Sequence, residues 1–252
     1  MKTYTKYHLI ILFILVLFSN SFTQELNQAE ESSLVLGVEN DFITRYIWQG
    51  LECNNGLIHQ PTVWITLEDF TFFTWASITQ HEDDNNEISN ELDFAVKYSK
   101  QIDMVNLESS LTYIYCLQED YPPTAEMFLR IGLDLYDYEI YSDLTTDVME
   151  YSGSTSGNLG VNKNLFENDN LSVQAGLSIG WANKLFNKNY VGAEENLKPF
   201  NYTMFSVEAV YYVYDKFYIK PHIEYFYLFS PAYKQSTGNS LENFGIAAGV
   251  EF

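Results

Sequence analysis

The last nine residues constrain the fold of this chain more than any other segment. From Phe244 onward every second residue is apolar, and the residues between are small or charged. A period of two is typical of a β-strand with one apolar face. The alternating residues are Phe244, Ile246, Ala248, Val250 and Phe252. We therefore predict that the chain ends in a strand with one apolar and one small or polar face.

This terminal strand resembles the C-terminal assembly signal of bacterial outer-membrane β-barrel proteins. The resemblance rests on Phe244, Ile246, Val250 and the terminal Phe252. It implies the outer membrane of a Gram-negative bacterium as the location. Its implied partners are the barrel-assembly machinery, which would bind the C-terminal strand, and the outer-membrane lipid and lipopolysaccharide around the barrel.

The start of the chain predicts export. Lys2 and Lys6 precede an apolar run over residues 9–18, and the small residues Ser21 and Thr23 fit a cleavage site before Gln24, which is the plan of a secretory signal peptide. The run is too short for a spanning helix, which needs about 20 apolar residues. We expect a signal peptide at 1–23, a short periplasmic segment at 24–32 and one barrel domain at 33–252.

The composition fits alternating strands. The chain is 46% hydrophobic and 17% aromatic, yet its mean hydropathy is only −0.16. Lipid-facing and lumen-facing residues of a barrel cancel in such an average, whereas spanning helices would not. The formal net charge of −21 argues against a nucleic-acid partner, because such binders neutralise phosphates with Lys and Arg.

Alternation recurs along the whole chain. Besides 244–252, it marks residues 34–42, 62–67, 70–78, 92–98, 107–115, 127–135, 140–148, 156–165, 171–181, 205–213 and 217–227. The connections alternate between short ones, such as 68–69 and 215–216, and longer ones, such as 49–60, 79–89, 182–200 and 230–243. Short periplasmic turns and long external loops are typical of outer-membrane barrels. The predicted fold is an all-β transmembrane antiparallel barrel of about twelve strands, with the last strand closing on the first.

A motif near the first strand indicates a family. Residues 45–50 read Arg-Tyr-Ile-Trp-Gln-Gly, followed by Gln60-Pro61 and a strand bearing Trp75. This arrangement is similar to that of the TorF-like porin family of outer-membrane proteins, which implies a porin-like barrel but no particular solute. Gln49 stands where many relatives have a second Arg. Read without the family, Tyr46 and Trp48 fit an interfacial aromatic belt, and Arg45 fits a headgroup or lumen contact.

Charged residues on the polar faces of the strands are the candidate site. We predict that they line the lumen, where they either pair across strands or select ions in a water channel. These residues are Lys97, Arg130, Lys220, His222, Glu108, Asp134, Glu208 and Glu224.

Catalytic and metal signatures are weak. The sequence contains no nucleophile elbow, phosphate-binding loop or metalloprotease motif, so we predict no enzyme activity, no cofactor and no metal. The acidic segment 81–87 lacks the glycine and spacing of a calcium loop and fits a solvated external loop better. A disulfide between Cys53 and Cys116 is left open, because geometry decides it.

The expected function is a porin-like channel for passive diffusion of small solutes or ions through a polar lumen. Three alternatives remain. One is a plugged structural or adhesive barrel that acts through its external loops, another is a lipid-acting barrel enzyme that uses His222, and the third is a soluble periplasmic β-sandwich.

Overall fold

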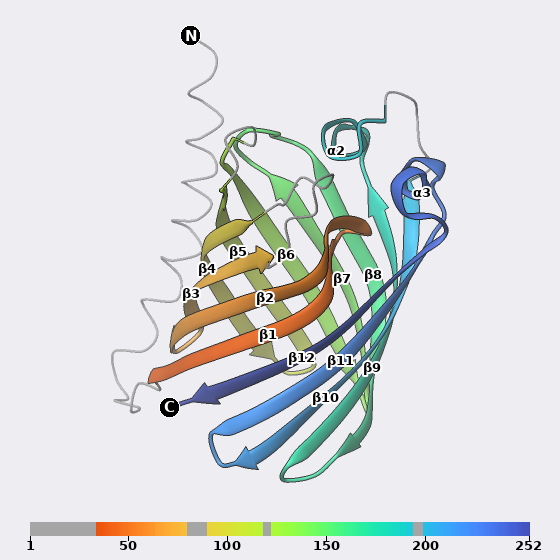
Figure 1. Cartoon of the computed structure of the whole chain (residues 1–252). Coiled ribbons are helices and arrows are strands. Elements are labelled where there is room, and N and C mark those ends of the chain that lie inside the picture. Colours follow the sequence, from red (N-terminus) through yellow and green to blue (C-terminus); the bar gives the residue numbers. More distant parts are fainter. Residues whose placement is uncertain (1–33, 80–89, 118–121, 194–198) are drawn as a thin grey trace. The chain divides into compact units, whose positions relative to one another are not determined.

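The computed structural model describes residues 34–79, 90–117, 122–193 and 199–252, and in these ranges twelve antiparallel strands form a closed barrel (Figure 1). The strands are β1 (Leu34–Trp48), β2 (Leu51–Leu67), β3 (Phe70–Thr79), β4 (Glu91–Ile102), β5 (Val105–Cys116), β6 (Thr124–Leu135), β7 (Tyr138–Asp147), β8 (Thr155–Glu167), β9 (Leu171–Ala182), β10 (Phe200–Tyr214), β11 (Phe217–Leu228) and β12 (Ser240–Glu251). The predicted fold class is confirmed, and a sandwich is excluded. The predicted signal peptide, the segment 24–32 and the acidic segment 81–87 lie outside the described residues.

The barrel closes between its first and last strands, as expected. β12 pairs antiparallel with β1, with Gly37 opposite Glu251 and Ile43 opposite Gly245. Lipid cannot satisfy free backbone N–H and C=O groups, so a sheet in a bilayer has to close on itself.

The outer wall is apolar. The side chains of Phe244 and Ile246 on β12 are each 50% exposed, and Leu177 on β9 is 52% exposed, whereas Ala247 on the inner face is fully buried. An apolar surface of this extent would be a liability in water but matches the lipid-facing band of a transmembrane barrel. None of the helices within the described residues has the length and apolar character that a membrane crossing requires.

The two ends of the barrel differ. At the end where β1 begins and β12 stops, here named the terminus end, the connections have three residues or fewer. Glu68 and Asp103, in two of these turns, have positive φ, which matches the twist of tight hairpins. The opposite end, the loop end, carries α2 (Lys184–Asn189) and α3 (Pro231–Thr237) (Figure 1).

One predicted loop was wrong. Residues 49–60 were expected as a long external connection, but β1 continues to Trp48 and β2 begins at Leu51, so only Gln49 and Gly50 form the turn. Both have positive φ, 51° and 77°, as a tight hairpin turn requires. Register shifts beyond Ile43 interrupt the pairing of β1 with β2. Such bulges break the period of two, which is why the sequence pattern ends before the strand does.

Candidate functional site

The inner face of β12 is a strip of small residues over which longer side chains lie. A Cβ atom at Gly245 would stand 2.1 Å from Nε2 of His222, and one at Gly249 would stand 2.4 Å from Cζ of Tyr218. Both neighbours belong to β11. Because Gly245 and Gly249 have no side chains, residues of β11 can reach across β12 to β1.

Two acidic residues of β1 receive these side chains. Lys220 Nζ lies 2.9 Å from Glu39 Oε1, and the Tyr218 hydroxyl donates to Glu39 Oε2 at 2.7 Å. His222 Nε2 lies 2.9 Å from Asp41 Oδ2. These contacts connect β11 with β1 across β12. They therefore stabilise, from inside the barrel, the pairing of the first and last strands. Lys220 and His222 were expected in the lumen, but Glu39 and Asp41 were missed as their partners, because only barrel closure brings them together.

A second group of polar contacts lies on the β6–β8 wall. Arg130 Nη2 lies 2.6 Å from Glu139 Oε2, and the guanidinium carbon stands 3.8 Å from the ring centroid of Tyr141. Asn162 donates to the same Glu139 oxygen at 2.9 Å. These bonds join adjacent strands along the wall.

The other predicted lumen residues have separate surroundings. Asp134 accepts hydrogen bonds from Asn106 at 2.9 Å, and Glu224 accepts one from Asn243 at 3.2 Å. For the remaining three, Lys97, Glu108 and Glu208, no ion pair falls within the described ranges. Strand register directs their side chains inward.

The tip of the β1–β2 hairpin, residues 46–52, bends over the loop end. The Tyr202 hydroxyl on β10 donates to Gln49 Oε1 at 3.1 Å, and a Cβ atom at Gly50 would lie 2.4 Å from Cδ1 of Tyr202. β10 is separated from β1 by β11 and β12 in the barrel order. The tip therefore crosses the inner faces of two strands to reach it.

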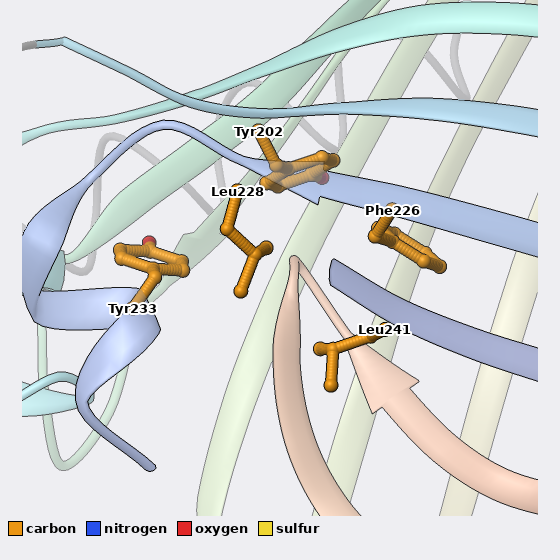
Figure 2. Packing of buried hydrophobic residues seen from close by; sticks show 5 residues of the cluster. All are labelled: Tyr202, Phe226, Leu228, Tyr233 and Leu241. Atoms are coloured by element: carbon orange, nitrogen blue, oxygen red, sulfur yellow. The ribbon is translucent and has the colours of Figure 1, made fainter. Parts of the chain in front are cut away.

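Apolar packing holds the tip in this position. Ile47 and Leu51 pack against a buried cluster inside the loop end (Figure 2). The cluster consists of Tyr202, Phe226, Leu228, Tyr233 and Leu241, which come from β10, β11, α3 and β12. This is the only buried apolar cluster found among the described residues, so the barrel core lies at its loop end.

Helix α2 supports the other side of the tip. The Trp48 ring lies 5.3 Å from that of Phe186 and 5.1 Å from that of Tyr190, centroid to centroid. The Asn183 side chain caps α2 by accepting from Phe186 N–H at 2.8 Å. Burial raises the pKa of Tyr190 above its usual range, so its hydroxyl stays protonated and donates to Asp147 Oδ2 at 2.9 Å.

Tyr233 links the two helices. Its hydroxyl accepts from Asn201 Nδ2 at 2.9 Å and donates to Asn187 Oδ1 of α2 at 3.4 Å. The hairpin tip, α2 and α3 therefore form one connected layer at the loop end.

Residues 45–50, the motif that resembles the TorF-like family, lie in this hairpin. Arg45 pairs with Glu52 on the opposite strand at 3.0 Å, and the Tyr46 ring lies 5.5 Å from the inward-facing Trp75. Tyr46 and Trp48 thus pack within the loop end, and their expected place in a lipid-facing belt was wrong. Gln60 and Pro61 pair with Asp41 and Asn40 of β1, deeper in the barrel.

Neither a disulfide nor a metal centre is found in the described part of the chain. Cys53 and Cys116 both retain thiols. No group of three or more His, Cys, Asp or Glu side chains in these ranges is placed to hold a metal ion.

Solved outer-membrane barrels share this fold. No protein-family model and no curated protein matches the sequence. The COG4313 outer membrane channel from Pseudomonas putida F1 is 9% identical with a TM-score of 0.51, over 91% of this chain and 98% of that chain. The KdgM porin is 8% identical with a TM-score of 0.50, over 86% and 99%. LpxR from Salmonella typhimurium is 9% identical with a TM-score of 0.52, over 86% and 99%.

These likenesses, together with the apolar outer wall, define a transmembrane β-barrel of the outer-membrane type. At such low identity they establish the fold and not an activity. The resemblance to the TorF-like family stays a prediction.

Proposed function

We propose that this protein is an outer-membrane channel through which small solutes diffuse passively. The observation that carries the proposal is the solvent exposure of Gln174 and Glu208, two inward-facing residues of β9 and β10. An inward side chain in a packed, plugged barrel would be buried, so exposure there supports a water-filled bore.

The charges on the inner wall favour cations. Three basic residues of the inner wall are already paired with carboxylates. Lys220 pairs with Glu39, His222 with Asp41 and Arg130 with Glu139. Glu108 and Glu208 also face the lumen and form no ion pair within the described ranges. Rings of carboxylates select cations in channels.

The orientation follows from the fold class. The terminus end would face the periplasm and the loop end the exterior, because short turns are periplasmic in such barrels. The barrel-assembly machinery would recognise β12, and lipopolysaccharide would surround the apolar wall on the outer side.

Planar-bilayer recording with the refolded protein tests the channel. We expect step-like potassium currents and, across a potassium chloride gradient, a reversal potential displaced toward that of potassium. Heat-modifiable migration on a gel checks that the protein is folded. Folded protein without current above the detergent control would contradict the proposal.

The hairpin tip favours one competing function, a plugged structural or adhesive barrel, because it covers part of the loop end. That function predicts folded protein without conductance. A lipid-acting enzyme is less favoured, since His222 faces the lumen and pairs with Asp41, away from the lipid-facing wall.

A further inference from the structure

A recess in the lumen wall is formed by inward residues of β9, β10 and β11. We infer that it is a binding subsite for a small organic cation with an ammonium or guanidinium group, and this inference rests on the proposed channel function. Its volume is about 140 Å³, and its inward side chains are those of Gln174, Ser206, Glu208, His222 and Glu224, with Gly176 between them.

Strand register sets these residues in two rows. Glu208 is paired with Gln174 on one side and His222 on the other, and Ser206 is paired with Gly176 and Glu224. A Cβ atom at Gly176 would lie 2.6 Å from Ser206 Oγ and 2.8 Å from Asn162 Oδ1, so glycine at this position lets the Ser206 hydroxyl lie beside the backbone at the edge of the recess. Ser206 and Glu208 stand near the middle of β10, at mid-depth in the barrel.

The charge of the recess is unbalanced. Glu208 and Glu224 are diagonal neighbours on adjacent strands, a position that places the two residues roughly 7–8 Å apart and their Cβ atoms somewhat closer. Of the basic residues of β11 beside them, Lys220 reaches across β12 to Glu39, and His222, which borders the recess, is hydrogen-bonded to Asp41. Glu224 accepts a hydrogen bond from Asn243, and neither carboxylate forms an ion pair within the described residues, so a positive group from a solute would meet both charges.

The shape and donor set favour an organic cation over a metal ion. No three ligating side chains within the described residues converge as a metal requires. Carboxylates at this spacing can instead each accept N–H donors from a planar guanidinium or a diamine. The Ser206 hydroxyl and the Gln174 amide add neutral hydrogen-bonding groups beside the charge.

Calorimetric titration of the folded full-length barrel in detergent tests the subsite with agmatine, which carries both a guanidinium and an ammonium. We expect saturable binding at millimolar concentrations and none for glucose. Glu208→Gln and Glu224→Gln should each weaken it about tenfold, because each removes a charged acceptor. The matched control is Glu108→Gln, a lumen-facing change on β5, which should leave the affinity unchanged.

Absence of saturable agmatine binding to the folded wild-type protein would overturn the inference. Equal weakening by Glu108→Gln would overturn it too, because it would indicate that acidic residues throughout the lumen attract agmatine. Because the titration needs no current, it is independent of the bilayer recording. Current without agmatine binding refutes only the subsite, whereas folded protein without current refutes the channel.

Discussion

Replacing Gly245 with valine should destabilise the barrel by removing the space that His222 occupies over β12. The new Cβ would stand 2.1 Å from His222 Nε2 and 2.8 Å from Ile43 Cγ2, and Ile43 is only 3% exposed. The imidazole has to leave its position 2.9 Å from Asp41, which costs about 1.5–3 kcal/mol for a hydrogen bond to a charged group. Overpacking against Ile43 adds about 1–3 kcal/mol.

The expected loss is therefore about 2.5–6 kcal/mol in the free energy of unfolding. Urea unfolding in detergent or lipid vesicles, followed by tryptophan fluorescence and by gel mobility, measures it. Ala248→Val is the control, since it places a valine on the same strand but on the exposed outer face. The reasoning is refuted if Gly245→Val and Ala248→Val unfold at the same urea concentration.

Three further changes test the other parts of the structure. Trp48→Ala removes the aromatic contacts with Phe186 and Tyr190, which stabilise the hairpin tip by about 0.5–1.5 kcal/mol each beyond burial. The loosened tip should raise single-channel conductance, whereas Trp181→Ala, on the outward face of β9, should leave the conductance unchanged. Leu111→Arg on the lipid-facing side of β5 should cost about 2–4 kcal/mol in urea unfolding, and the adjacent inward Thr112→Arg much less; equal costs would contradict the assigned facing. Because its pKa is raised by burial, Tyr190 holds its proton more tightly in the folded state, so its contribution to stability is complete below pH of about 10 and declines above it. The fall in stability between about pH 10 and 12 should thus be shallower in Tyr190→Phe, and an unchanged slope would contradict this assignment.

Sequence reasoning predicted the wall of the barrel well, because a strand that faces lipid on one side and water on the other has to alternate. The outward-facing residues of β12 and the inward placement of Lys220 and His222 follow from that two-residue period alone. The partners of these charges could not be found in the same way. Glu39 lies on a strand at the other end of the chain, and no local pattern indicates which residue it meets.

The position of the hairpin tip could not be predicted from the sequence. Residues 45–50 were singled out by their resemblance to a family, yet their place over the loop end depends on the bulges in β1 and on contacts with β10 and α2.

By itself, the sequence determined the closed transmembrane barrel, its strand number and the apolar face of its last strand, because lipid imposes a local two-residue rule on every strand. Only the tertiary structure explains why the other face of that strand consists of glycine and alanine. Gly245, Ala247 and Gly249 leave the space through which Tyr218, Lys220 and His222 reach β1, and such contacts exist only once the two ends of the chain have closed the sheet.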